Sequence, residues 1–149
     1  MSKKFVITGG AGFIGSNLAE ALARENDVVV IDDLYTGKAE NLSDIDALLQ
    51  VRGSITDLDL LRSAFEGADC VYHLAAIASV KKSVEDHLQT NYVGIDGTLN
   101  VLVAARDTGV RRVILASSAA VYGSSPDLPK ARGHAARAEV ALCCLKTGR

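Results

Sequence analysis

The stretch TGGAGFIG, which runs from Thr8 to Gly15, constrains the fold of this chain more than any other part of it. It follows a short apolar run, KFVIT, that predicts a buried strand, and it precedes apolar residues at helical spacing. Its three glycines form the pattern G-x-x-G-x-x-G. In a strand–turn–helix unit these glycines permit a tight turn, a close approach to pyrophosphate and tight helix packing, in that order. The stretch therefore predicts a dinucleotide-binding loop, and the alternative is a glycine-rich turn without a ligand.

An acidic pair favours the dinucleotide-binding loop. Asp32, with Asp33 beside it, ends the apolar run DVVVID, a second predicted strand, at roughly the 20-residue spacing expected after such a loop. A carboxylate at this place can accept hydrogen bonds from the 2′-hydroxyl of an adenosine ribose, and it repels a 2′-phosphate. We therefore expect NAD rather than NADP as the cofactor. The alternative role for Asp32 is that of a solvated turn residue or a cap.

Strand and helix signals alternate along the chain. Helical patterns cover residues 12–26, 42–50, 56–67 and 83–109, and further strands are predicted over residues 51–55, 69–76 and 111–118. Continuous Val and Ile runs suit parallel strands that are buried on both faces. The order predicts the α/β class, as a Rossmann-type doubly wound parallel sheet with helices on both faces, truncated after the fifth strand.

Composition narrows the class of function. The chain has 149 residues, 48% of them hydrophobic, and a net charge of -2, which predicts one globular domain that binds no nucleic acid. No apolar run approaches the about 20 residues that span a membrane, and the N-terminus does not resemble a signal peptide. An odd number of cysteines without framework spacing favours a reducing compartment, so we expect a cytoplasmic protein. Histidines and cysteines without ligand spacing predict no metal site.

Five motifs carry a resemblance to a known family. TGGAGFIGSNL, IDDL, HLAA, GTLNVL and SSAAVYG occur here in the order and spacing of the extended short-chain dehydrogenase/reductases. Over about residues 3–130 the chain most resembles the NAD-dependent nucleotide-sugar epimerases of the UDP-glucose 4-epimerase type. In such enzymes a base takes the proton of the sugar 4-hydroxyl while hydride moves to NAD and later returns.

The resemblance implies a role for each matching position. The glycine loop would hold the pyrophosphate, Asp32 the adenosine ribose, and the residues after the fifth strand the nicotinamide. Ser118 would be the catalytic serine, which hydrogen-bonds to the sugar hydroxyl that is oxidised. His73, in contrast, is interpreted as a core histidine. The implied cofactor-binding residues are Gly9, Gly12, Phe13, Ile14, Gly15, Asp32, Asp33, Thr36, Gly37, Ser54, Ile55, Leu74, Ala75, Ala76, Ala116 and Ser117.

Four positions depart from the family pattern or distinguish between its activities. Ser54 stands where the family commonly has an aspartate near the adenine, and Gly94 stands where it has an asparagine, for which Asn91 is a candidate replacement. The residues after Ser118 are Ala119 and Ala120, where 4,6-dehydratases carry carboxylates. Because alanine cannot transfer a proton, the sequence favours an epimerase over a dehydratase.

The catalytic base of the family has no counterpart in the protein sequence. The family's Tyr-x-x-x-Lys should follow Tyr122, yet no later tyrosine occurs. When the possible codons for residues 139–147 are read from one base later, they permit Lys-Ser-Pro-Tyr-Ala-Val-Ser-Lys, which contains the motif. The same shift applied from Lys130 onward permits the acidic, proline-rich segment that precedes this motif in the family. Our hypothesis is an inserted base near codon 130, and the alternative is a genuine alanine-rich helical tail.

These observations give a domain prediction and competing functions. Residues 1–130 would be the N-terminal part of an NAD-binding Rossmann domain and residues 131–149 a tail outside the family pattern, with the C-terminal substrate domain absent. The first hypothesis is a nucleotide-sugar 4-epimerase, with a UDP-hexose as substrate and a possible homodimer, of which this chain is an inactive cofactor-binding fragment. The alternatives are a non-catalytic NAD-binding module and another nucleotide-sugar oxidoreductase or dehydratase of the superfamily.

Overall fold

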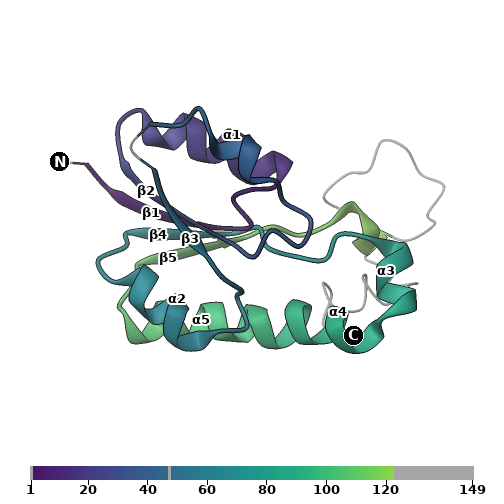
Figure 1. Ribbon diagram of the computed structural model, residues 1–149. Helices are drawn as coiled ribbons and strands as arrows, with labels where there is room; N and C mark the ends of the chain where they lie inside the picture. Colours follow the sequence, from purple (N-terminus) through teal and green to yellow (C-terminus); the bar gives the residue numbers. More distant parts are fainter. Residues whose placement is uncertain (1, 47, 123–149) are drawn as a thin grey trace.

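Five parallel strands form one sheet in the computed structural model, which describes residues 2–46 and 48–122. The strand order is β3-β2-β1-β4-β5, with helices on both faces (Figure 1). This confirms the predicted doubly wound α/β architecture. The strands are β1 (Lys4–Thr8), β2 (Asp27–Asp32), β3 (Leu48–Arg52), β4 (Cys70–His73) and β5 (Arg112–Leu115).

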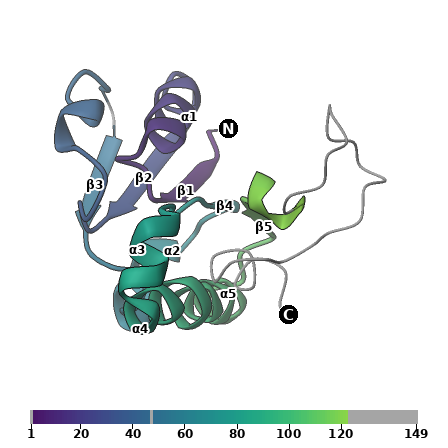
Figure 2. The ribbon, with the colours of Figure 1, turned by 90° about the vertical axis from the view of Figure 1, so that its right-hand side faces the viewer.

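The helices lie in two layers. Helix α1 covers one face of the sheet, and α2 and α5 lie side by side against the other (Figures 1 and 2). The helical segments are α1 (Phe13–Ala23), η1 (Ala39–Leu42), α2 (Leu58–Phe65), α3 (Val80–Glu85), α4 (His87–Asn91), the π-helix η2 (Tyr92–Asp96), α5 (Gly97–Asp107) and η3 (Ala119–Tyr122). None of the helices in the described part of the chain is long and apolar enough to cross a membrane.

Each face of the sheet has its own apolar core. Alternate residues of β1 point to opposite faces, so Val6 packs in the core under α2 and α5, whereas Ile7 packs in the core under α1. Both side chains are completely buried. The chain crosses to the second face after β3, and β4 then pairs with β1 on the side away from β2. The strand order therefore reverses between β1 and β4, the place where doubly wound sheets bind ligands.

The third strand lies earlier than the sequence predicts. A helix was expected over residues 42–50 and a strand over 51–55, but the structure has a short 3-10 helix at Ala39–Leu42 and β3 at Leu48–Arg52. Pairing with β2 sets this register, from Val28 opposite Leu48 to Asp32 opposite Arg52. The strand has five residues and ends directly before Gly53. The lack of a side chain at Gly53 makes room for Leu60 of α2. An edge strand tolerates the polar residues that made this segment resemble a helix.

The long helix predicted over residues 83–109 is broken in two places. Asp86 has a non-helical backbone and caps α4, since its carboxylate accepts a hydrogen bond from the Gln89 amide. A π-helical turn around Gly94 then separates α4 from α5. At the start of α5, a Cβ on Gly97 would lie 2.6 Å from Cδ1 of Ile55, so the glycine permits the close approach of helix and loop. These breaks bring α4 beside the carboxyl ends of the strands.

Candidate cofactor-binding site

The glycine loop after β1 is shaped by two glycines that no other residue could replace without movement. Gly9 has a φ of +73°, and a Cβ there would lie 2.6 Å from the backbone nitrogen of Ala75. Its own amide donates to the carbonyl of Ile31 at 2.8 Å. A Cβ on Gly15 would overlap the Gly9 carbonyl. The loop is therefore drawn tightly between β2, β4 and α1, as the sequence predicts.

The first turn of α1 faces the solvent beside this loop. Gly12 is the N-cap, and because it has no side chain, no side-chain acceptor caps the N–H groups at the start of the helix. Phe13 and Ile14 follow with side chains 83% and 67% exposed. The backbone N–H groups of such a turn, with the helix dipole, attract an anion. Four of the five residues predicted to hold the pyrophosphate, Gly12 to Gly15, lie together at this turn, and Gly9 precedes it.

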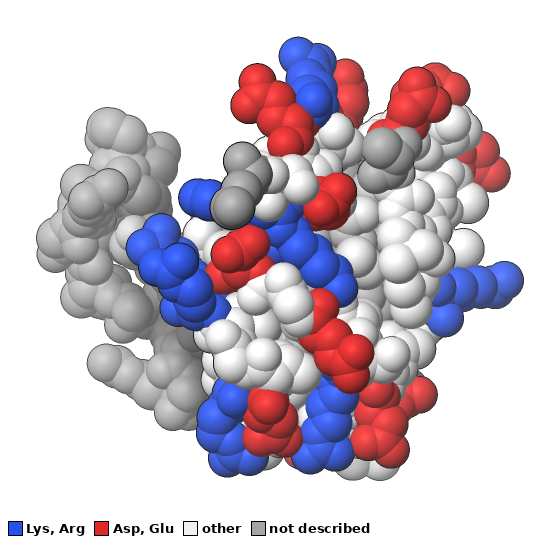
Figure 3. Space-filling model, turned by 90° about the vertical axis from the view of Figure 1, so that its left-hand side faces the viewer, with Lys and Arg blue, Asp and Glu red and all other residues white. Residues whose placement is uncertain are grey.

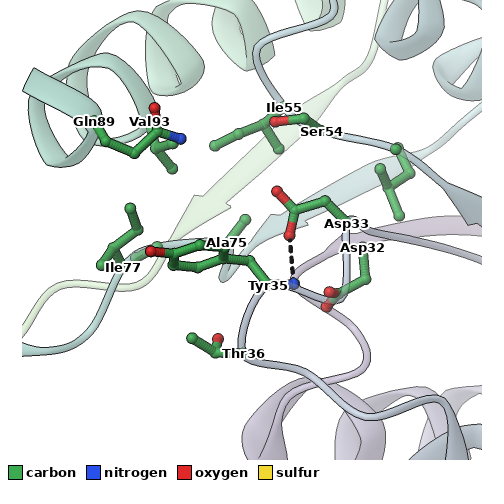
Figure 4. A pocket seen from close by; sticks show the side chains of 14 residues that line it. Asp32, Asp33, Tyr35, Thr36, Ser54, Ile55, Ala75, Ile77, Gln89 and Val93 are labelled. Carbon is green, nitrogen blue, oxygen red and sulfur yellow. Dashed lines mark hydrogen bonds between the residues drawn. The ribbon is translucent and has the colours of Figure 1, made fainter. Parts of the chain in front are cut away.

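Asp32 ties the glycine loop to the turn that follows β2. Its Oδ2 accepts a hydrogen bond from the Ala11 amide at 2.9 Å, and its Oδ1 accepts one from the Leu34 amide at 2.8 Å. An ionised carboxylate has about four acceptor positions, so two remain for a ligand hydroxyl. Asp33 bends the next turn by accepting from the Tyr35 amide at 2.9 Å (Figure 4). Its side chain enters the adjacent cavity.

The predicted adenosine residues surround one pocket. It lies at the carboxyl ends of the strands, between the end of β2, the loop after β3, the loop after β4 and helix α4 (Figure 4). The predicted residues that line it are Gly9, Asp32, Asp33, Thr36, Ser54, Ile55, Ala75 and Ala76.

Some lining residues were missed by the sequence prediction. Gln89 and Val93 stand one helical turn apart and reach the pocket from α4 and η2. Tyr35 and Ile77 complete it from the neighbouring loops. The i, i+4 spacing of Gln89 and Val93 was visible in the sequence, but a single continuous helix gave no reason to place them beside the sheet edge. The other predicted residues, namely Gly12, Phe13, Ile14, Gly15, Gly37, Leu74, Ala116, Ser117 and Ser118, do not line this pocket.

Gly37 nevertheless belongs to the same site. A Cβ there would lie 2.9 Å from Oδ1 of Asp32, so this loop can close over the carboxylate only with glycine. The Lys38 amide and the Asn41 side chain both donate to the Ala11 carbonyl, at 3.1 Å and 2.8 Å. The loop after β2 is therefore fixed against the glycine loop.

A buried histidine connects the glycine loop with α5. His73 is 2% exposed, and its Nδ1 lies 2.7 Å from Oγ1 of Thr8 while its Nε2 lies 3.0 Å from Oγ1 of Thr98. Because Thr98 donates its proton to the Gly94 carbonyl at 2.7 Å, it accepts from Nε2–H, and Nδ1 then accepts from Thr8. His73 is therefore a core histidine. Through Thr98 it links the end of β1 to the π-helical turn at Gly94.

Comparison with known proteins decides the family. The sequence profile of the NAD dependent epimerase/dehydratase family matches residues 5–139. The chain belongs to this family. It is 42% identical over 131 residues to a UDP-glucose 4-epimerase of Mycolicibacterium smegmatis, across 83% of this chain and 42% of that protein. It is 40% identical over 125 residues to a UDP-N-acetyl-alpha-D-glucosaminuronate decarboxylase of Bacillus cytotoxicus, across 83% of this chain and 39% of that protein.

Solved structures of this epimerase family share the fold closely. A UDP-N-acetylglucosamine 4-epimerase from Methanobrevibacter ruminantium superposes with a TM-score of 0.90 at 36% identity, over 99% of this chain and 48% of that one. A Thermus thermophilus UDP-glucose 4-epimerase in complex with NAD gives 0.87 at 37% identity, over 97% and 48%. The chain thus spans about half the length of the family members that it matches.

The second half of the predicted site begins after β5. The Ala116 amide donates to the His73 carbonyl at 3.1 Å, which continues the pairing of β4 and β5. Ser117 is exposed and Ser118 half-buried, and the Ser118 carbonyl accepts from the Val121 amide at the start of η3. These residues lie at the same carboxyl edge of the sheet as the glycine loop. The predicted tail over residues 131–149, with its altered Tyr-x-x-x-Lys, lies outside the described residues.

The described residues at the edge of the sheet opposite the site form no patch of one charge on the face drawn in Figure 3. On the face drawn in Figure 3, at the amino ends of the strands, basic and acidic side chains are interspersed. The site at the carboxyl edge instead combines backbone donors near α1 with the carboxylates of Asp32 and Asp33. No three His, Cys, Asp or Glu side chains of residues 2–46 and 48–122 form a group that could hold a metal ion.

Proposed function

We propose that this chain is the cofactor-binding part of an NAD-dependent nucleotide-sugar 4-epimerase that acts on a UDP-hexose. One observation carries the proposal: Asp32 lines the pocket and also accepts a hydrogen bond from Ala11 of the glycine loop, directly before the open first turn of α1. Family members named UDP-glucose 4-epimerase, from Mycolicibacterium smegmatis and Streptomyces lividans, support the choice of substrate.

The residues present fit NAD. A pyrophosphate would lie beside Gly12, facing the N–H groups of the first turn of α1, while Gly9 and Gly15 let the loop pack closely against the end of β4 and the start of α1. Asp32 keeps acceptor positions for ribose hydroxyls, and the pocket beside it takes the adenine. When bound, NAD would supply a temporary acceptor for the hydride of the sugar C4.

The chain's own contribution to the chemistry is Ser118. Its hydroxyl would hydrogen-bond to the sugar 4-hydroxyl and orient it for proton removal. The alanines that follow Ser118 cannot exchange protons with C5 or C6 of a sugar. That absence favours epimerisation over the dehydration named for a relative of 37% identity, the dTDP-glucose 4,6-dehydratase of Mycobacterium tuberculosis.

The tyrosine that would accept the proton is encoded, in this proposal, in a shifted reading frame of the gene. We propose that one base is inserted near the codon for Lys130, and that the original frame encodes Tyr-x-x-x-Lys and a C-terminal substrate domain. In the enzyme so restored, the lysine would lower the pKa of the tyrosine hydroxyl and make it the base. Residues 1–130 would then be the native cofactor half, and the chain printed here would bind NAD without turning over a sugar.

An exposed apolar stripe supports a homodimer of that complete enzyme. Exposed side chains recur at spacings of three and four along α4, η2 and α5, which places them on one side of these helices. Each of them is at least 46% exposed. The residues are Leu88, Tyr92, Ile95, Leu99 and Leu102.

A direct test restores the reading frame. The gene should be sequenced through codon 130 and beyond, expressed with the extra base removed, and the product incubated with UDP-galactose. We expect interconversion with UDP-glucose without net consumption of NAD, and a loss of about 100-fold in kcat for Ser118→Ala, within the range of acid–base positioning. The chain of 149 residues is the control and should be inactive.

Two outcomes would contradict the proposal. Formation of a 4-keto-6-deoxy sugar from a nucleotide-glucose would identify a dehydratase instead. A downstream sequence without Tyr-x-x-x-Lys in either shifted frame would favour the second candidate, a non-catalytic NAD-binding module, because NAD binding alone agrees with both functions.

A further inference from the structure

Ser54 lines the adenosine pocket at the position where the family pattern has a carboxylate (Figure 4). Its Oγ accepts two hydrogen bonds from Thr56, one from the backbone amide at 3.3 Å and one from Oγ1 at 3.0 Å. A hydroxyl oxygen has two acceptor positions and one proton. Both acceptor positions of Ser54 are therefore occupied within its own loop, and the proton is the part of the hydroxyl left for a ligand.

From this geometry we propose that Ser54 reads the base of the bound dinucleotide as a hydrogen-bond donor to a ring nitrogen. A carboxylate at the same place can only accept, and the group of adenine that it can bind is the 6-amino group. Ser54 thus reverses the polarity of recognition at this point. The inference rests on the proposed binding of NAD and specifies which atoms of the base this chain contacts.

The loop that carries Ser54 is fixed before any ligand arrives. Nδ2 of Asn100, on α5, donates to the carbonyls of Ile55 at 3.3 Å and Thr56 at 3.1 Å. The Gly53 amide donates to the Asp32 carbonyl at 3.1 Å. Ile55 is 4% exposed in the core under α5. The orientation of the hydroxyl is consequently set by protein contacts, which is the condition for selective recognition.

Other polar side chains of the pocket can also accept from an amino group, among them Asp33 and Gln89. Asp33 uses Oδ1 for the Tyr35 amide and keeps its other oxygen, and Gln89 presents an exposed carboxamide (Figure 4). Either of them could give the whole pocket a preference for adenine. The test must therefore isolate Ser54 by changing the residue and the 6-amino group together, as in a double-mutant cycle.

The experiment compares two ligands on the 149-residue chain by isothermal titration calorimetry. The ligands are NAD⁺ and nicotinamide purine dinucleotide, in which hydrogen replaces the 6-amino group. We expect Ser54→Ala to weaken both by the same factor, about 3- to 10-fold, as for one neutral hydrogen bond. We expect Ser54→Asp to increase the preference for NAD⁺ over the purine analogue about 5-fold or more, since it adds an acceptor for the amino group.

Thr56→Val provides a matched variant that leaves Ser54 in place. It removes the hydroxyl that donates to Ser54 and keeps the side-chain volume, so it opens one acceptor position on Oγ. We expect this variant to prefer NAD⁺ over the purine analogue more strongly than the wild type does, because the freed acceptor position on Oγ can bind the 6-amino group. Thermal unfolding of each variant verifies that the loop substitutions leave the chain folded.

The outcomes separate the inference from the function on which it rests. If the loss in Ser54→Ala occurs with NAD⁺ and disappears with the purine analogue, Ser54 accepts from the amino group and the inference is wrong. An unchanged affinity for both ligands would equally exclude a contact with the base. Failure of the folded wild-type chain to bind NAD⁺ at all would refute the proposed function, and the inference with it.

Discussion

Gly9 shows how one residue can be required for both the fold and the ligand. Its positive φ turns the chain out of β1, and its lack of a side chain lets the Ala75 backbone approach. Gly67 has almost the same φ, +70° against +73°, but nothing lies within 4 Å of the position of its missing Cβ. A comparison of the two positions therefore distinguishes the cost of a positive φ, which both share, from the cost of a steric clash, which occurs only at Gly9.

We predict different costs for alanine at these positions. Gly67→Ala should lower the free energy of unfolding by about 1 kcal/mol, the cost of a strained backbone alone. Gly9→Ala adds a clash with a strand end and should cost more than about 3 kcal/mol, with loss of NAD⁺ binding. Urea unfolding of both variants measures the difference. Equal costs would mean that the contact with Ala75 does not constrain the loop.

Residue identities alone predicted much of the site, because glycine and aspartate act there through local geometry. Ser54 was predicted near the adenine and lines the pocket, but its hydrogen bonds with Thr56 became clear only from the structure. Gln89 was missed because its place depends on the break at Asp86. The local conformation of the loop after β3 and the helix break at Asp86 were therefore the part that the sequence could not supply.

At the scale of elements, the same division separates correct predictions from wrong ones. β1, β2 and β4 are buried apolar runs, and the structure confirms them. β3 contains Gln50 and Arg52 and was displaced in the prediction, because only its pairing with β2 fixes the register. The helix after β4 was predicted as continuous, since its apolar spacing continues through the π-helical turn.

Helices α2 and α5 are joined by an acid-sensitive ion pair. Arg62 of α2 contacts Asp107 of α5 at 2.8 Å, and Arg106 lies 2.7 Å from the same carboxylate. Hydrogen bonds from Arg62 and then Arg106 hold the pKa of Asp107 below its ordinary value. Asp107 therefore stabilises the fold above the pKa of an unfolded aspartate, about 3.9, and this contribution is lost as the pH falls through the lower folded pKa.

We predict that Asp107→Asn makes the free energy of unfolding less dependent on pH below about pH 5. The wild type should lose stability more steeply than the variant as the pH falls toward 3, as measured by urea unfolding. Asp59→Asn is the control, because Asp59 also contacts Arg62 but its side chain is 91% exposed. An identical pH slope for wild type and Asp107→Asn would show that the pair contributes nothing.

At the scale of the whole molecule, the described residues form half of a larger family pattern. The cofactor loop, the adenosine pocket and Ser118 lie along one edge of the sheet, which the strand order alone would predict. β5 is the last strand of the described sheet, and Leu115 is 53% exposed. The family members matched here are about twice as long as this chain.

The central claim is that this chain forms a site for NAD by itself, and calorimetric titration with NAD⁺ and NADP⁺ tests it most directly. We predict saturable binding of NAD⁺ and at least about tenfold weaker binding of NADP⁺, because the Asp32 carboxylate would repel the 2′-phosphate by more than about 1.4 kcal/mol. The absence of NAD⁺ binding by folded chain, or equal affinity for both dinucleotides, would contradict the account.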